Sequence, residues 1–220
     1  MSGFPPQALT FLAELKANNR RDWFAEHRPL YDRAIRGPTE TLAADLSANL
    51  SERLDEPFAS KIFRIQRDVR FAKDKSPYNA HVHVGFWPGG RGADRAGPGF
   101  YLALEPDRLL LGTGVFDLSG AALDAYRADV AGDAGAALAD LLAGLAAQGL
   151  RLDGAQLKRT PAPYAADHPR ADLLRRKGLS LWRDVEDRSL IASPDLSDLC
   201  LETFETLAPL YRWLAETLAA

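Results

Sequence analysis

The spacing of apolar residues changes abruptly near residue 60, and this change restricts the fold class more than any other feature of the sequence. Before residue 54, apolar side chains recur every three or four positions, as Leu9, Leu12 and Leu15 do, which predicts helices over 7–54. From residue 61 they alternate with polar side chains, which predicts a strand over KIFRIQRDVRF. Three further strand patterns follow, HVHVGFW, GFYLALE and RLLLGTGVF, so a sheet is expected over 61–116.

Consecutive strands of this kind form an antiparallel sheet with one face packed on helices. Within the first helical region, Pro29 predicts a kink, and Pro38 suits the first turn of a new helix. The Gly/Pro-rich stretch between Pro88 and Gly99 is expected to be a mobile loop.

The rest of the chain has mainly helical patterns. Two Ala/Leu-rich helices are expected over 119–148, followed by the short strand AQLKR and helices within 150–220. One of these helices is expected from His168 to Gly178, and another from Ser193 through a kink at Pro209. Because the sequence shows no repeat and no linker, we predict one α+β domain over 1–220. Its antiparallel sheet, of about four to six strands, packs against N-terminal and C-terminal helices.

Composition excludes few functions. The 220 residues are 46% apolar and 26% charged, as in ordinary globular proteins. The single cysteine, Cys200, cannot form an internal disulfide and is expected to be a buried apolar side chain. The sequence has neither a signal-peptide pattern nor an apolar run long enough for a bilayer, so a cytoplasmic location is expected. It lacks the G-x-S-x-G, Walker and H-E-x-x-H motifs, and no cofactor is expected.

Five segments, spread in order along the chain, form recognisable motifs. They are FLAELKANNRRDWFAEHRPLY, FRIQRDVRFAKDKSPYNAHVHVGF, GFYLALE with LLLGTGVF, LKRTPAPYAADHPRADLLRRKG, and LAPLYRWL. Together they resemble the bacterial domain-of-unknown-function family 2461 over essentially the whole chain. The resemblance implies a bacterial single-domain protein. It implies no reaction, cofactor or catalytic residue, so no functional role is transferred to any position.

Positive charge is concentrated in two segments, although the whole chain has a formal net charge of −3. Residues 61–75 and residues 158–177 each carry six cations and two acids, a net charge of +4 per segment. If 61–71 is a strand, Arg64, Asp68 and Arg70 share one face with Gln66, at spacings of about 7 Å between alternate positions. Two arginines beside an aspartate would bind a phosphate or carboxylate bidentately.

The alternative is that these arginines form a solvated strand face with carboxylate partners, each ion pair contributing little. Arg67 falls on the apolar side of the pattern, so it needs a partner or marks a polar cleft. The expected anion-binding residues are Arg64, Arg67, Arg70, Lys73, Lys75, Ser76, Lys158 and Arg159, and the candidates for proton transfer are Asp68 and Tyr78.

His81 and His83 lie two positions apart on an expected strand, so their side chains face the same way. Zinc needs three or four ligands, and neither His27 nor His168 has a suitable spacing to this pair. We therefore expect strand histidines that are exposed or hydrogen-bonded, and no metal site.

Three interpretations of function remain. The leading one is a protein that binds a small anion, with enzymatic action on a phosphorylated or carboxylated metabolite left open, in a concave site to which both basic segments contribute. The second is a nucleic-acid-binding module in which Phe71, Tyr78 and Trp87 stack on bases, although the isoelectric point of 5.8 is low for such a protein. The third is a non-catalytic domain that docks a partner protein through its N-terminal aromatic side chains or the Ala-rich region 121–147. No membrane partner is expected.

Overall fold

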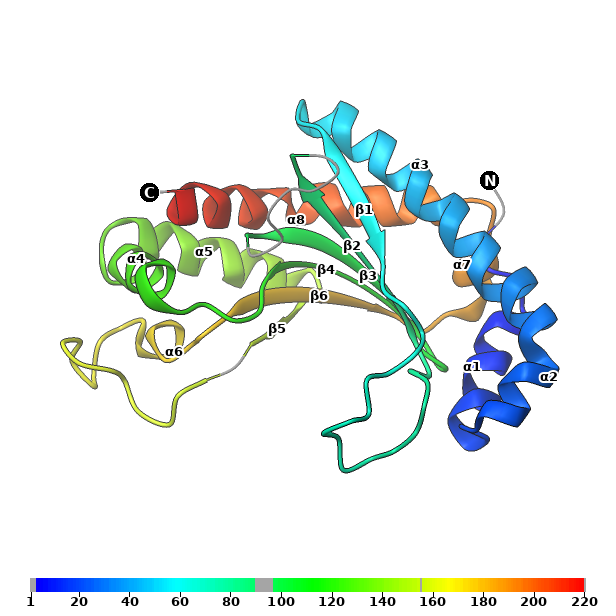
Figure 1. Cartoon of the computed structure of the whole chain (residues 1–220). Coiled ribbons are helices and arrows are strands. Elements are labelled where there is room, and N and C mark those ends of the chain that lie inside the picture. Colours follow the sequence, from blue (N-terminus) through cyan, green and yellow to red (C-terminus); the bar gives the residue numbers. More distant parts are fainter. Residues whose placement is uncertain (1–2, 90–96, 155, 220) are drawn as a thin grey trace. The chain divides into compact units, whose positions relative to one another are not determined.

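The computed structural model describes residues 3–89, 97–154 and 156–219 (Figure 1). The helices are α1 (Gln7–Ala17), α2 (Arg21–Tyr31), the π-helix η1 (Asp32–Arg36), α3 (Gly37–Leu54), α4 (Gly120–Ala131), α5 (Ala134–Ala147), α6 (Ala171–Leu174), α7 (Arg188–Ala192) and α8 (Leu196–Ala219). The strands are β1 (Phe58–Ile62), β2 (Val82–Pro88), β3 (Gly99–Leu104), β4 (Leu109–Val115), β5 (Arg151–Asp153) and β6 (Leu179–Val185).

Within the described residues, these strands form one six-stranded antiparallel sheet in the order β1-β2-β3-β4-β6-β5. The predicted α+β class and the antiparallel sheet are therefore confirmed. The loop expected between Pro88 and Gly99 includes residues 90–96, which lie outside the described part of the chain.

The described residues group into two compact units. The first contains those within 1–93, 101–111 and 184–202, and the second those within 94–100, 112–183 and 203–220.

In the first unit, the N-terminal helices follow the sequence prediction closely. Helix α1 buries the apolar side chains whose spacing predicted it, including Leu9, Leu12 and Leu15. Helix α2 continues through Pro29, and the change of helix type comes just after it, in the five residues of η1. Helix α3 then has Pro38 in its first turn and ends at Leu54, and the next residue, Asp55, has a left-handed φ of 51°.

Side chains of α3 hold the start of β1, and the two elements lie side by side (Figure 1). The Ser51 hydroxyl accepts a hydrogen bond from the Phe58 N–H at 2.8 Å, and the Ser47 hydroxyl donates to the Phe58 carbonyl at 2.8 Å. Ser197 at the start of α8 donates to the Asp45 carboxylate on α3. Hydroxyl groups therefore fix the helix against the edge strand.

The strand predicted over 61–71 is wrong beyond its first residues. Strand β1 ends at Ile62, which pairs with Val84. The next residues fold back on themselves, because the Asn79 N–H donates to the Ile65 carbonyl at 2.7 Å and Gln66 forms a bridge with Tyr78. Segment 63–80 therefore pairs with its own returning arm, and the expected alternation of faces is lost. Phe71, assigned to the apolar face, is 96% exposed.

In the second unit, the two helices expected over 119–148 are present as α4 and α5, and they pack on each other. The Tyr126 side chain of α4 is fully buried, and its hydroxyl donates to the Leu173 carbonyl at 3.1 Å. Burial raises the pKa of the Tyr126 hydroxyl far above its usual value. Phe100 of β3 contacts Phe204 and Tyr211 of α8, with ring centroids 5.2 and 4.9 Å apart.

Three elements between residues 150 and 190 differ from the prediction. Strand β5 lies at Arg151–Asp153, before the segment AQLKR, in which Gln156 forms an isolated bridge with Arg176. The helix expected from His168 to Gly178 shrinks to the single turn α6. Strand β6 was missed, although it pairs with β5. Its run of apolar residues is short and lies between charged residues, so the sequence pattern did not indicate a strand there.

Helix α8 runs to Ala219 with Pro209 inside it. Across the described residues, no single helix has both the length and the apolar composition of a membrane span.

Candidate functional site

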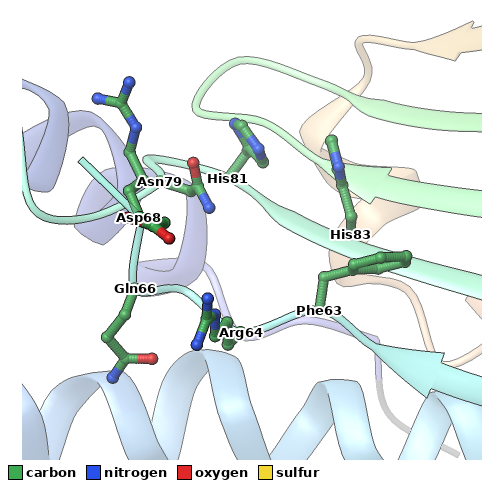
Figure 2. A pocket seen from close by; sticks show the side chains of 8 residues that line it. Phe63, Arg64, Gln66, Asp68, Asn79, His81 and His83 are labelled. Carbon is green, nitrogen blue, oxygen red and sulfur yellow. The ribbon is translucent and has the colours of Figure 1, made fainter. Parts of the chain in front are cut away.

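A polar hollow of about 430 Å³ lies in the first unit, between the start of segment 63–80 and the entry to β2. Figure 2 shows Phe63 and Arg64 on the arm that leaves β1, Asn79 and His81 on the arm that leads into β2, and His83 on β2 itself. The hollow is lined by Phe63, Arg64, Gln66, Arg67, Asp68, Asn79, His81 and His83. We call it the histidine–arginine pocket.

The two histidines of the pocket lie stacked on each other. His83 lies in β2 and His81 just before its first residue, two positions away, and their rings lie on the same side, as predicted. The ring centroids are 4.1 Å apart, with an angle of 22° between the ring planes. The His83 carbonyl accepts a hydrogen bond from the Phe63 N–H at 2.9 Å, which fixes this part of the strand against the outgoing arm.

Both imidazoles are neutral at pH 7. Desolvation, the largest cause, together with the neighbouring His81 lowers the pKa of His83 to about 4, and Glu105 opposes the shift. The pKa of His81 is also lowered, again first by desolvation and then by Arg67, with Glu105 opposing. A neutral imidazole both donates and accepts a hydrogen bond, so the pair offers polar groups without repelling a cation or an anion.

Arg67 is tied into its own loop. Its guanidinium donates to the Asp74 carboxylate at 2.5 Å and to the Ser76 carbonyl at 3.2 Å. Asp74 also accepts from the backbone N–H and the hydroxyl of Ser76, at 2.9 and 2.7 Å. These bonds hold the pKa of the Asp74 carboxyl far below its usual range. Arg67 thus has the partner that its place in the sequence pattern required, and that partner is Asp74.

Arg64 is exposed at the pocket and differs from Arg67 in its partners. Among the residues that the structure describes, no carboxylate lies within ion-pair distance of Arg64. Arg64 also lowers the pKa of Asp68 through space, as the smallest of the causes that act on that carboxyl, after the hydrogen bonds from Arg70 and the opposing desolvation. The guanidinium of Arg64 therefore has its donors available to a ligand.

The fork of Arg64, Asp68 and Arg70 expected on one strand face does not form. Asp68 accepts hydrogen bonds from the Arg70 guanidinium at 2.6 and 3.0 Å, and these bonds are the largest cause of its lowered pKa. Arg70 itself does not line the pocket. The reason is the early end of β1, which leaves Arg70 in the loop, next to its own acid.

Tyr78, the other candidate for proton transfer, has a structural role. Its backbone N–H donates to the Asn19 side-chain oxygen at 3.0 Å, and its carbonyl accepts from the Asn19 amide at 2.8 Å. Its ring stacks on Phe24, with the centroids 4.2 Å apart. Tyr78 does not line the pocket, so it is not placed to exchange a proton with a ligand there.

The other expected anion-binding residues of this loop also lie outside the pocket. The Lys75 ammonium donates to the Val69 and Arg70 carbonyls at 3.0 and 3.4 Å, and Ser76 is bound to Asp74. Lys73 is exposed and has no hydrogen bond or ion pair within the described part of the chain. Of the six cations in the fully described segment 61–75, only Arg64 and Arg67 line the pocket.

Comparison with known proteins agrees with the motifs in the sequence. The model of a family described as conserved hypothetical protein (DUF2461) matches residues 7–213. The chain belongs to this family. No curated protein matches the chain. The DUF2461 match covers both compact units, and it includes every residue of the histidine–arginine pocket.

The second basic segment of this DUF2461 protein belongs to the other compact unit. Arg170 donates to the carbonyls of Val130, Ala131 and Gly132, at 2.6, 2.9 and 3.0 Å, and so caps the end of α4. Arg176 is 7% exposed and donates to the Asp153 carbonyl at 3.0 Å.

Arg175 binds Asp172, and both Lys158 and Arg159 are exposed. Much of this positive charge therefore stabilises the fold. A contribution of Lys158 and Arg159 to the same ligand as Arg64 stays a prediction.

Sequence reasoning missed the contribution of the histidines and Asn79 to the site. The available signal was the His-x-His spacing next to a basic segment. We considered it as a metal motif and preferred exposed or hydrogen-bonded strand histidines, but did not weigh it as part of an anion site. Among the described residues, no group of three His, Cys, Asp or Glu side chains is placed to hold a metal ion.

Proposed function

We propose that this protein binds a small anionic ligand, carrying a carboxylate or phosphate, in the histidine–arginine pocket. The observation that carries the proposal is the Arg64 guanidinium, which lines the pocket beside two stacked imidazoles and has no ion-pair partner among the described residues. A guanidinium presents paired N–H donors whose geometry matches a carboxylate or phosphate.

The other groups of the pocket support an anion in preference to a cation. The acid of the pocket, Asp68, is already bound by Arg70. Asn79 and Gln66 supply side-chain amides, which donate hydrogen bonds, and the two neutral imidazoles add further donors. Arg67 adds positive charge at the wall, although its own bonds go to the loop. The lining therefore combines one available guanidinium with several neutral donors.

Calorimetric titration with inorganic phosphate and with acetate, at low ionic strength, tests the proposal. Arg64→Gln is expected to weaken binding at least about tenfold, since a hydrogen bond to a charged group contributes about 1.5–3 kcal/mol. The matched control is Lys73→Gln, which removes the same charge from an exposed position outside the pocket. Equal affinity in wild type and Arg64→Gln, or absence of any anion binding by the wild type, would refute the proposal.

A second candidate function, binding of single-stranded nucleic acid, is favoured by one specific observation. Phe71 is 96% exposed, and the Arg70 guanidinium lies 5.9 Å from its ring centroid. Lys73 and Lys75 follow in the same loop, so an aromatic ring is presented among cations, the combination that stacks bases and follows a phosphate backbone. Fluorescence anisotropy with a labelled single-stranded oligonucleotide should show binding that weakens with salt and with Phe71→Ala. No binding at low salt would remove this candidate.

We also propose that the protein works in the bacterial cytoplasm. The support is the single cysteine, Cys200, which is buried and offers no internal disulfide. Immunoblotting of separated cytoplasmic, periplasmic and membrane fractions tests this location.

A further inference from the structure

A second hollow, of about 620 Å³, lies in the same compact unit as the histidine–arginine pocket. It is built by α1, the approach to β2, the turn between β3 and β4, and α7. Its lining residues are Ala13, Lys16, Ala80, His81, Glu105, Pro106, Asp107, Arg108 and Arg188. We call it the hairpin pocket.

One side chain borders both hollows. His81 lines the histidine–arginine pocket and also the hairpin pocket, and its ring is half-buried. A ligand group in either hollow is therefore next to the same imidazole. Because the pKa of His81 is lowered, the imidazole that borders both hollows is neutral at pH 7. It therefore places no charge between them.

Charged residues of the hairpin pocket fall into two groups. The first is a chain of paired charges, in which Arg108 binds Glu105 at 2.8 Å and Asp184 at 3.5 Å. The guanidinium of Arg108 and the carboxylate of Glu105 thus largely neutralise each other at this wall.

The second group is Lys16 and Arg188, both exposed at the pocket. In the described ranges 3–89, 97–154 and 156–219, neither has a carboxylate within ion-pair distance. Asp107, an exposed acid, also lines the hollow. The remaining charges of this pocket are therefore two cations and one acid, so the pocket is positive. Arg64, which lines the other hollow beside His81, is positive as well.

We propose that the ligand carries two acidic groups joined by a spacer, one bound at Arg64 and the other at Lys16 and Arg188, with the spacer passing His81. This rests on the proposed function, since Arg64 provides the first anchor. Dicarboxylates and phosphorylated carboxylates are the chemical class that fits. Two separated cationic anchors on either side of a neutral wall select such a ligand over a compact monoanion, because a monoanion reaches only one anchor.

The test is calorimetric titration with succinate, adipate and suberate, compared with acetate as the matching monocarboxylate. At least one dicarboxylate is expected to bind the wild-type protein at least about tenfold more tightly than acetate, because it gains charge-assisted hydrogen bonds at a second anchor. The double variant Lys16→Gln/Arg188→Gln is expected to lose this advantage, so that the dicarboxylates bind it no more tightly than acetate does. Arg64→Gln is expected to weaken the binding of both acetate and the dicarboxylates.

The control is the double variant Arg21→Gln/Lys73→Gln, which removes the same two charges from exposed positions outside both pockets. Dicarboxylates that bind no better than acetate would overturn the inference, as would an advantage that survives in Lys16→Gln/Arg188→Gln. In both cases Arg64-dependent acetate binding would leave the proposed function standing. If the wild type binds none of these anions, the proposed function and the inference fail together.

Discussion

The imidazole rings of His81 and His83 stack with their centroids 4.1 Å apart, and this contact joins two groups whose protonation the protein disfavours. Stacking brings two groups that would repel each other as cations into contact. Desolvation and mutual repulsion therefore favour the neutral pair. The charged groups that act on the pair are Glu105, which favours protonation of both rings, and Arg67, which disfavours protonation of His81.

The first prediction concerns stability between pH 6.5 and pH 4. His83 has a pKa of about 4 in the folded protein and an ordinary value of 6.5 when unfolded, so the unfolded chain binds more protons in this range. The free energy of unfolding must then decrease as the pH falls from 6.5 to 4. Urea denaturation at several pH values should show this slope in the wild type and a smaller slope in His83→Asn. The paired acids Asp68 and Asp74 contribute below this range, because their pKa values are lowered from 3.8.

The second prediction concerns the pH dependence of anion binding. An anion in the pocket stabilises the imidazolium forms of His81 and His83, which raises their pKa values in the complex. Binding therefore takes up protons, and affinity for acetate must increase as the pH falls from 7 towards 5.5. Calorimetry in buffers of different ionisation enthalpy measures the proton uptake directly. The double variant His81→Asn/His83→Asn should bind with little proton uptake, and undiminished uptake in this variant would contradict the assignment.

The sequence correctly predicted helices, whose residue spacing is a local pattern. It failed for strands whose extent depends on which segment of the chain pairs with them. Leu9, Leu12 and Leu15 lie on one buried face of α1 because helical spacing alone fixes their direction. Alternation of apolar and polar residues over 61–71 does not by itself produce a strand, since a strand exists only where a neighbouring segment pairs with it. After Ile62 the nearest partner is the chain's own returning arm, so Phe71 becomes exposed.

The charge pattern predicted which segment contributes to the candidate site, but not which of its side chains line the pocket. The reason is again that the strand expected over 61–71 ends at Ile62. The basic segment 61–75 does supply Arg64 and Arg67 to the pocket, and Asp68 lines it as well. Which cations are neutralised depends on local loop geometry, in which Asp74 captures Arg67 and Asp68 captures Arg70. Charge counting cannot separate an available guanidinium from one that is already bound.

The third prediction separates structural cations from binding cations in the second basic segment. Arg170→Gln removes a guanidinium that donates to three carbonyls at the end of α4, and it is expected to lower the free energy of unfolding by about 1–3 kcal/mol. Arg159→Gln, at an exposed position of the same segment, removes the same charge and should change stability by less than about 0.5 kcal/mol. Denaturation in urea measures both. Equal effects of the two variants would show that Arg170 does not act as a cap.

The fourth prediction concerns Asp74, which organises the loop that forms one wall of the histidine–arginine pocket. Its carboxylate accepts from the backbone and the hydroxyl of Ser76 and from Arg67, so Asp74→Ala removes three acceptor bonds at once. Limited proteolysis within 67–76 should become faster in Asp74→Ala. Asp74→Asn, which keeps an acceptor for Ser76 but loses the ion pair, should be cleaved at an intermediate rate.

The same Asp74 variants report on the pocket because they release the positive charge of Arg67. In Asp74→Asn the Arg67 guanidinium loses its carboxylate partner while Ser76 keeps its hydrogen bonds, so acetate should bind more tightly than to the wild type. Asp167→Asn, an exposed acid of the other compact unit, has the same change in net charge and should leave acetate affinity unchanged. A gain of equal size in both variants would mean that net charge alone attracts the anion. A gain confined to Asp74→Asn would mean that the anion lies within reach of Arg67, at the wall where the two arms of segment 63–80 meet.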